Sequence, residues 1–221
     1  MRKTFKYRLY PTGHQVQALD HQLGEACRLY NGALQERRDA YQYAGISLSY
    51  YDQANQLKAI RAGDGCDLAN FSGSQDVLRR VDKAFQAFFR RVERGEVPGY
   101  PRFKSRFRYD SITFPSYGDG ARLRDNGKLY VQGVGELKVK LHRVVVGRIK
   151  TVTIKREGGR WYVCFSVEMI PAPDAVLYED IGIDLGLTSF AVLSDGTVID
   201  NPRCYRRAQG FLIKNLLEIS I

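Results

Sequence analysis

Alternating hydrophobic and polar positions predict a β-strand near the start of the chain. In the segment "TFKYRLYP", Phe5, Tyr7 and Leu9 would share one face, and Lys6 and Arg8 would lie on the other. Pro11 ends the alternation, because proline cannot donate a ladder hydrogen bond. The pattern therefore indicates a half-buried strand whose exposed face is basic.

Apolar residues then recur at intervals of three and four, which is typical of amphipathic helices. Thr12 and Gln15 have the spacing of a capping box, and the apolar stripe behind them runs from 16 to 34. Ser49 and Asp52 repeat that spacing and predict the start of a second helix. The chain should therefore enter a helical region directly after its first strand.

A third helix is predicted to open at Ser74 and to carry an apolar stripe over 77–92. Gly95 stands where a C-terminal cap belongs. The segment "PGYPRFKSRFRYD" at 98–110 contains two prolines and a glycine, so it cannot continue the helix.

From Ser111 onward the period changes to that of strands. Asn126-Gly127 and Gly158-Gly159 each separate two alternating segments, which is a hairpin signal. "PAPD" at 171–174 has the composition of a linker. The order of strand, three helices and several antiparallel strands predicts an α+β fold followed by the start of a second domain.

Charge adds a candidate partner to this picture. The 221 residues contain 34 Lys and Arg against 24 Asp and Glu, a net charge of +10. Residues 79–108 concentrate that excess, with ten cations against three acids and four aromatic residues between 100 and 109. A solvated helix face is the plain alternative. Guanidinium groups that pair with phosphates, beside rings that stack on bases, favour a nucleic-acid surface.

Two other classes of protein fit less well. The basic start lacks the apolar core of a signal peptide, and no run is long enough to span a bilayer, so we expect a cytoplasmic protein and no membrane partner. The four cysteines, Cys27, Cys66, Cys164 and Cys204, include no C-x-x-C pair, so no zinc is expected.

A carboxylate interrupts the apolar segment "GIDLGLTSFAVLSDG" at 182–196. Asp184 stands between Ile183 and Leu185, where a buried charge would be costly without a partner. Three interpretations are open: a structural aspartate, a phosphate motif like that of actin-like ATPases, and the first metal-binding aspartate of a ribonuclease H-like nuclease. The last would use two divalent metals to polarise a phosphate and activate water.

The chain resembles TnpB, the OrfB-type accessory transposase of bacterial insertion sequences. The pieces that carry the resemblance are "KYRLYPT", "CRLYNGALQERRDAY", "AFQAFFRRVERGEVPGYPRFKSR", "SITFP", "GIDLGLTSFAVLSDG" and "NPRCYRRAQ". The family consists of transposon-encoded, RNA-guided DNA endonucleases, so the resemblance implies a guide RNA and a target DNA as partners.

The resemblance also implies an arrangement of domains. The expected segments are the first strand of a wedge domain (1–11), a helical recognition lobe with a helix-turn-helix-like start (12–108), the wedge β-barrel (109–175) and the start of a RuvC-like nuclease domain (180–221).

Candidate site residues follow from the charge pattern and from the resemblance. Asp184 is the expected catalytic and metal-binding residue, with Mg²⁺ as its metal. The expected nucleic-acid-binding residues are Lys3, Lys6, Arg8, Tyr10, Arg28, Arg37, Arg79, Arg80, Arg90, Arg91, Tyr100, Arg102, Phe103, Lys104, Arg106 and Arg108.

The chain departs from the family after Asp184. Its only later acids are Asp195, Asp200 and Glu218, none of which is well placed to complete a metal site, and no zinc ribbon is present. We therefore expect a C-terminally truncated protein with an incomplete RuvC domain, which binds guide RNA and target DNA without cutting. The unpaired edge of that domain would offer a route to self-association. The alternative is a non-catalytic nucleic-acid-binding regulator of transposition.

Overall fold

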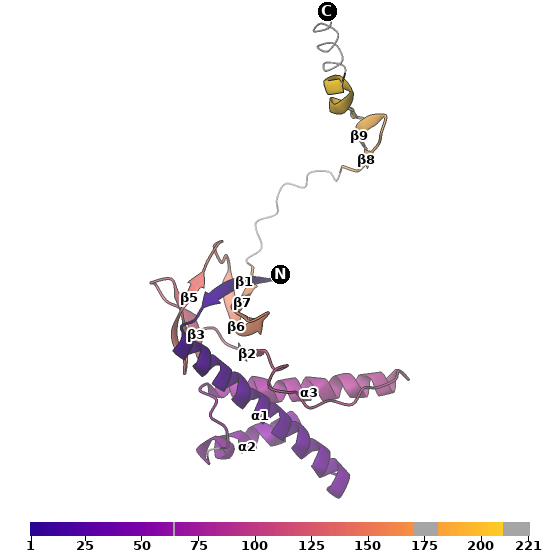
Figure 1. Cartoon of the computed structure of the whole chain (residues 1–221). Coiled ribbons are helices and arrows are strands. Elements are labelled where there is room, and N and C mark those ends of the chain that lie inside the picture. The colour runs from indigo at the N-terminus through magenta and orange to yellow at the C-terminus, as the bar shows by residue number, and fades with distance from the viewer. Residues whose placement is uncertain (64, 170–180, 210–221) are drawn as a thin grey trace, which may run out of the picture. The chain divides into compact units, whose positions relative to one another are not determined.

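The computed structural model describes residues 1–63, 65–169 and 181–209. The chain divides into two compact units, Met1–Pro171 and Ala172–Ile221 (Figure 1). Each unit is described by itself below.

The first unit is built on one antiparallel sheet of seven strands. Their order across the sheet is β2-β6-β7-β1-β5-β4-β3. The bounds are β1 Arg2–Tyr10, β2 Ser111–Phe114, β3 Ala121–Leu123, β4 Lys128–Val131, β5 Gly135–Lys140, β6 Arg148–Glu157 and β7 Arg160–Glu168.

The first strand lies in the middle of this sheet, although the other six strands come more than a hundred residues later. β1 pairs with β7 on one side, where Phe5 faces Phe165, and with β5 on the other, where Leu9 faces Val139. The helices are thus inserted between strands of a single sheet. The two predicted hairpins are confirmed, since β3 pairs with β4 and β6 pairs with β7.

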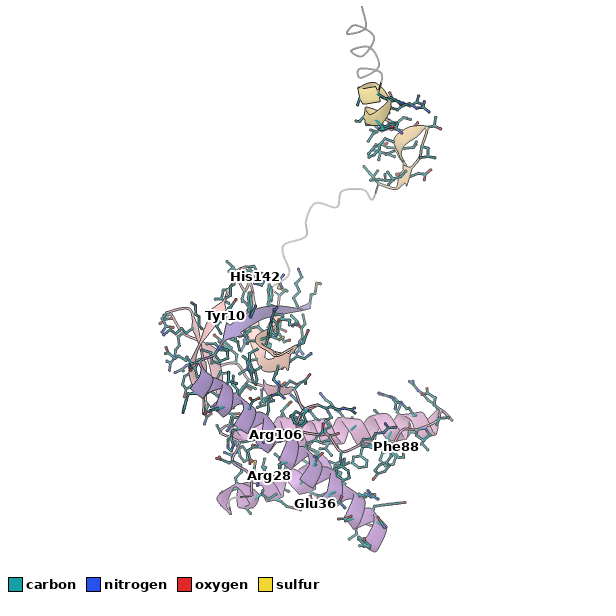
Figure 2. The ribbon with its side chains drawn as sticks, viewed as in Figure 1. Tyr10, Arg28, Glu36, Phe88, Arg106 and His142 are labelled. Atoms are coloured by element: carbon teal, nitrogen blue, oxygen red, sulfur yellow. The ribbon has the colours of Figure 1, made fainter. Side chains whose placement is uncertain are left out.

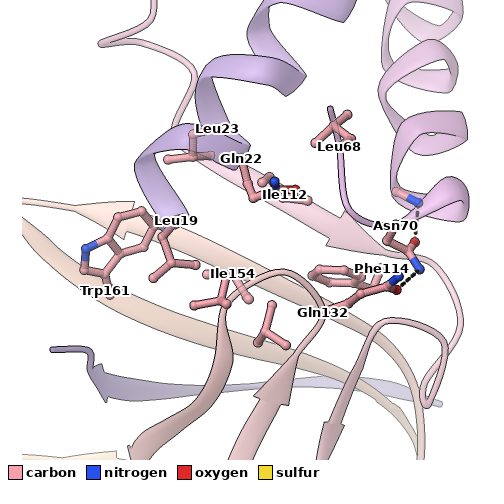
Figure 3. Close-up of a pocket in the computed structure, with 13 residues that line it drawn as sticks. Leu19, Gln22, Leu23, Leu68, Asn70, Ile112, Phe114, Gln132, Ile154 and Trp161 are labelled. Carbon is pink, nitrogen blue, oxygen red and sulfur yellow. Dashed lines mark hydrogen bonds between the residues drawn. The ribbon is translucent and has the colours of Figure 1, made fainter. Parts of the chain in front are cut away.

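One face of the sheet forms the core with helix α1 (Gly13–Ala44). The predicted capping box is present, with the Thr12 hydroxyl accepting from the Gln15 amide at 3.4 Å. Leu19 and Leu23 are buried against side chains of the sheet, among them Trp161 (Figure 3). The alternation of β1 explains this face, because its three apolar residues all point into the core.

Two more helices, α2 (Tyr50–Ala62) and α3 (Phe71–Glu93), pack beside α1 and extend with it from one end of the sheet (Figure 1). α2 begins with the predicted capping box of Ser49 and Asp52. None of the helices in the described ranges combines the length and the apolar character needed to cross a membrane.

The predicted start of α3 at Ser74 is wrong. The helix begins three residues earlier, where the Asn70 side chain accepts from the Gly73 amide at 2.7 Å. Ser74 lies buried within the first turns, and its hydroxyl donates back to the Asn70 carbonyl at 3.1 Å. Serine and asparagine are both good caps, so the local sequence does not distinguish them. Asn70 also bonds to Gln132 (Figure 3) and to Asp119, and these tertiary contacts fix the cap.

The prediction of a mixed helix-and-sheet fold is confirmed, but the predicted β-barrel is not found. Within the described residues the sheet stays open, with β2 and β3 as its two edge strands. β2 is instead covered by helices, because it contacts both α3 and α1. A helix against an edge strand protects it without barrel closure.

The second unit contains a small antiparallel sheet in the order β10-β9-β8. Its strands are β8 Ile183–Leu185, β9 Ser189–Leu193 and β10 Val198–Asp200. Ala191 is buried at its centre, while most of the surrounding apolar side chains are exposed. "PAPD" at 171–174 lies outside the described residues.

Candidate nucleic-acid interface

The face of the large sheet that points away from the core is basic and aromatic. We call it the outer sheet face; its acids include Glu136 and Glu157, and its basic and aromatic residues include Lys6, Arg8, Tyr10, Arg122, Lys128, Tyr130, Lys138, Lys140 and Tyr162. Residues opposite each other in an antiparallel ladder lie on the same face, and the register pairs Arg8 with Tyr162 and with Lys140. It likewise pairs Tyr10 with Lys138. The alternation that buries the apolar residues thus gathers cations and tyrosines on the other side.

Cations already contact the rings on this face. The Lys6 ammonium lies 4.4 Å from the Tyr162 ring centre, and the Arg8 guanidinium lies 5.0 Å from that of Tyr10. Lys6 also pairs with Glu157 at 2.9 Å, and this bond lowers the pKa of the glutamate. Part of the positive charge is therefore balanced within the protein.

Lys138 and Lys140 are exposed on the outer sheet face, and neither has an ion-pair partner among the described residues. They are the strongest candidates that the sequence interpretation missed. The sequence pattern that could have identified them is the alternation of "ELKVKLHRV", which predicts that both lysine side chains lie on the same face of a strand. Only the register shows that this face continues that of Lys6 and Arg8.

A second basic surface lies on α1. Arg28, Lys104 and Arg106 line one hollow of 340 Å³, together with His21 and Asn31. We call it the basic hollow. Figure 2 labels Arg28, which lies on α1, and Arg106, which lies beside that helix. The structure thus brings the predicted residue Arg28 together with two others, Lys104 and Arg106, that stand 76 and 78 positions later in the sequence.

The chain holds Lys104 in place through its backbone. Asn31 accepts from the Lys104 amide at 2.9 Å and donates to its carbonyl at 2.9 Å. The Lys104 ammonium then lies over the rings of Tyr30 and Tyr109, at 4.9 Å and 5.6 Å. Because the backbone is clamped, the lysine approaches a ligand with little further loss of freedom.

Arg106 lies close above Gly24. A Cβ at position 24 would come within 3.4 Å of the arginine Nε, so the missing side chain lets the guanidinium settle against the helix. Beneath this surface, burial raises the pKa of the free Cys27 thiol, and Lys104 and Arg106 oppose that shift. The hollow is therefore a cationic surface over a neutral thiol.

The remaining predicted cations differ in how they are held. Arg90, Arg91, Arg102 and Arg108 are exposed, as is Phe103. Arg79 is half-buried, and its guanidinium lies 5.4 Å from the Tyr50 ring centre. The Tyr100 ring packs against Phe88 with centroids 5.4 Å apart, which brings the segment after α3 back along that helix.

Three further predicted residues, Arg80, Arg37 and Lys3, also lie outside both basic surfaces. Arg80 bonds to Asp76, to the Ser111 carbonyl and to Thr113, so its guanidinium connects α3 to β2. Arg37 is 7% exposed. Lys3 lies two residues before Phe5 on β1, so its side chain is on the same face of the sheet as Phe5 and on the face opposite Lys6.

Asp184 lies inside a strand, as the sequence predicts. It is exposed, however, and it pairs across β8 and β9 with Val192. Asp195 does not join it, because its carboxylate caps a turn by accepting from the Thr197 amide at 2.8 Å, a bond that lowers the pKa of the aspartate. Asp200 lies on β10, on the far side of β9.

These residues do not by themselves fit a magnesium site. Magnesium binds tightly only where several oxygen ligands converge. Among the described residues no group of three or more His, Cys, Asp and Glu side chains could hold a metal ion. Asp184 is a single carboxylate, and further ligands would have to come from outside these residues.

Comparison with known proteins finds a family match at the start of the chain. Residues 1–45 match a helix-turn-helix domain family, HTH_OrfB_IS605. In this structure that span contains β1, the single long helix α1 and its Gly45 cap.

Two relatives match the chain along its length. "Putative RNA-guided DNA endonuclease InsQ" of Escherichia coli (strain K12) is 26% identical over 224 residues, which cover 99% of this chain and 54% of the relative. A "Putative RNA-guided DNA endonuclease" of Streptomyces pristinaespiralis is 30% identical over 233 residues, covering 100% and 55%. The chain thus spans about half the length of the curated relatives it matches.

Among solved structures, a Cas12f1-sgRNA-target DNA complex aligns with a TM-score of 0.48 at 14% identity, covering 99% of this chain and 62% of that one. This likeness is too low to establish a shared fold. The OrfB-type domain at the start and the two relatives matched along the whole chain confirm the resemblance to the TnpB family that was found in the sequence.

Proposed function

We propose that this chain binds guide RNA and target DNA as the nucleic-acid-binding part of an RNA-guided DNA endonuclease. The observation that carries the proposal is the outer sheet face, where Lys138 and Lys140, which have no ion-pair partner among the described residues, share one surface with the exposed Tyr10 and the half-buried Tyr162. Both full-length relatives are named as endonucleases of this kind, which supports the assignment.

The two basic surfaces would bind different parts of a nucleic acid. The outer sheet face combines cations with rings, which suits unpaired nucleotides that can stack. The basic hollow presents cations around clamped backbone, which suits a phosphate. In the terms of the family, β1 and the later strands would form the wedge domain, and the helices between them would form the recognition lobe.

The second unit would begin a RuvC-like, ribonuclease H-type nuclease domain with Asp184 as its first catalytic carboxylate. Complete sites of this kind use divalent metal such as Mg²⁺ to stabilise the attacking and leaving oxygens. The described residues provide one such ligand. We therefore propose that the 221 residues alone bind without cutting; self-association through the small sheet stays a prediction.

The test compares salt dependence among paired substitutions. Binding of a single-stranded RNA should weaken with salt, with a slope of about −0.7 per phosphate contact. Lys138→Ala with Lys140→Ala should flatten that slope by about one to two contacts, and so should Arg28→Ala with Arg106→Ala. Lys58→Ala with Arg38→Ala is the matched control, because it removes two exposed cations from helices outside both surfaces.

Equal slopes in all three double variants would mean that only net charge matters, and the two surfaces would lose their role. Sequencing of the RNA that copurifies with the chain tests the partner. Guide-like RNA from the element supports the proposal. Recovery of transposon-end DNA alone would support a non-catalytic regulator instead.

A further inference from the structure

The far halves of α1 and α3 enclose a pocket that belongs to neither basic surface. It has a volume of 480 Å³ and is lined by Arg37 and Tyr41 of α1, by Phe85, Phe88 and Phe89 of α3, and by Tyr100. Phe88 lies on the side of α3 that faces the far half of α1 (Figure 2). We call it the aromatic pocket.

The rings form a connected wall that is open to solvent. The Phe85 and Phe89 centroids are 6.4 Å apart in a stacked arrangement, and Tyr100 stands edge-on to Phe85 at 5.8 Å. Phe89 and Tyr100 remain 54% and 46% exposed. A cluster of exposed rings is costly in water and usually marks a binding surface.

A buried donor at the pocket adds a second, independent observation. Arg37 is 7% exposed; its Nε donates to Gln53 at 2.8 Å and its Nη1 to Asp82 at 3.1 Å. Its Nη2 is enclosed by the protein and has no hydrogen-bond partner among the described residues, so a ligand reaches it only if a neighbouring side chain moves. A buried donor without an acceptor is unfavourable, so a ligand that supplies an acceptor there would gain from it.

The charges exclude a phosphate as the group that enters. The Asp82 carboxylate pairs with Arg37, the one charged residue among those described that line the pocket, and its second oxygen accepts from Gln86 at 2.6 Å, so the charge of the arginine is balanced within the protein. Exposed cations flank it in the sequence, with Arg90 next to Phe89 and Arg102 two residues after Tyr100. A neutral, flat group that is tethered to phosphates matches this arrangement.

We propose that the aromatic pocket takes one unpaired nucleobase of the bound nucleic acid, stacked on the rings and accepting a hydrogen bond from Arg37 Nη2. The base would be one that presents a carbonyl or ring-nitrogen acceptor on its free edge. This inference rests on the proposed function for its ligand. Beyond the proposed function, we infer that a single base binds in this pocket, apart from the nucleotides on the outer sheet face.

The experiment separates the base from the backbone with two probes of equal phosphate number. One is a 12-nucleotide single-stranded RNA of mixed sequence, and the other is an abasic oligomer of the same length. Phe89→Leu with Tyr100→Leu keeps apolar bulk but removes two flat rings. This double variant should bind the RNA about tenfold more weakly, with its salt slope unchanged, because stacking is lost while phosphate contacts are kept.

The abasic oligomer should bind the double variant and the wild type equally. Tyr51→Leu is the matched control, since Tyr51 is an exposed ring on α2 outside the pocket, and it should change neither affinity. Arg37→Lys keeps a charge for Asp82 but offers no planar fork of donors. It should reduce the preference among homopolymer RNAs more than it reduces the mean affinity.

Unchanged RNA affinity in Phe89→Leu with Tyr100→Leu would overturn the pocket while leaving the proposed function intact. An equal loss for both probes would also overturn it, since the rings would then support the backbone surface. Size-exclusion chromatography tests whether the pocket binds a second copy of the chain instead. A wild-type protein that elutes as a dimer and a double variant that elutes as a monomer would support that interpretation and overturn the proposal. Failure of the wild type to bind either probe would instead remove the proposed function itself.

Discussion

Two arginines show how burial decides the role of a residue. Arg28 and Arg80 both stand on predicted helices, and composition treats them alike. In the structure Arg28 is exposed at the basic hollow and pairs with Glu25 three residues earlier, whereas Arg80 is mostly buried between Asp76, Ser111 and Thr113. Sequence predicts where positive charge is concentrated. Which charges are free depends on partners that come from distant segments.

We predict that Arg80→Met destabilises the fold by about 2–3 kcal/mol while nucleic-acid affinity stays unchanged. The substitution leaves Asp76 without its partner, and the side chain of Asp76 is only 18% exposed. It also removes the donor to the Ser111 carbonyl at 2.8 Å. Urea denaturation measures the free energy of unfolding, and a gel-shift assay measures affinity.

Arg79→Met is the control for that substitution. Arg79 is the neighbouring residue of α3, and its contact is with the Tyr50 ring. Arg79→Met should lower the free energy of unfolding by less than about 1 kcal/mol, because a partly exposed cation–ring contact contributes no more than that. If Arg80→Met abolished binding in a protein that remained folded, the arginine would contact nucleic acid after all.

Tyr109 gives a prediction for alkaline pH. Burial raises the pKa of its hydroxyl from 10.0 to about 12, and the nearby Arg80 opposes the shift. Between these values the unfolded chain releases the proton while the folded chain keeps it, so unfolding becomes more favourable. The contribution is fully present below pH 10 and is lost as the pH rises toward 12.

Tyr109→Phe should therefore lose less stability than the wild type between pH 9 and pH 11.5. Lysine titration affects both proteins equally, so the difference between them isolates the tyrosine. Urea denaturation at the two pH values provides the measurement. Parallel losses in the two proteins would mean that the hydroxyl is not buried in solution.

At the scale of elements, periodicity predicted most of the first unit. The alternation of β1, the capping boxes of α1 and α2 and both hairpins are local signals, and the structure contains all of them. The sheet order is not local, because β1 pairs with strands more than a hundred residues away. The outer sheet face, and with it Lys138 and Lys140, could not be assembled before that pairing was known.

The start of α3 shows the same limit. We predict that Asn70→Ala costs about 2 kcal/mol, which is more than a cap alone, because the side chain also donates to Asp119 at 3.0 Å and to Gln132 at 3.1 Å. Asn70→Ser should recover about half of the loss, since serine restores the cap but reaches neither acceptor. Equal stability of the serine and alanine variants in thermal denaturation would show that the cap contributes nothing.

At the scale of the whole molecule, the candidate functions divide between the two units. Both basic surfaces and the aromatic pocket lie within residues 1–171, and Asp184 lies in the second unit. The local sequence predicted that Asp184 lies within a strand, because the aspartate stands between two apolar residues, Ile183 and Leu185. The ligands that would accompany it are not among the described residues.

We predict that Asp184→Ala leaves the affinity for single-stranded RNA within about twofold of the wild type. The residue is exposed on β8, and its loss removes a negative charge without leaving a buried group unpaired. A gel-shift titration at two salt concentrations checks this. A folded Asp184→Ala variant that no longer bound RNA would place the aspartate in the binding surface and contradict its assignment to a metal site.

The same division predicts that the 221 residues, given magnesium and a matched guide, bind target DNA but do not cleave it. One carboxylate holds magnesium weakly, because the ion keeps its water shell unless several charged oxygens converge. Without held metal ions, neither the attacking water nor the leaving oxygen is stabilised. Binding is expected to persist, because guide pairing supplies the sequence specificity. Cleavage and gel-shift assays on one preparation, beside Asp184→Ala, test both statements. Magnesium-dependent cuts that disappear in the variant would mean that Asp200, Glu218 or a second copy of the chain completes the site.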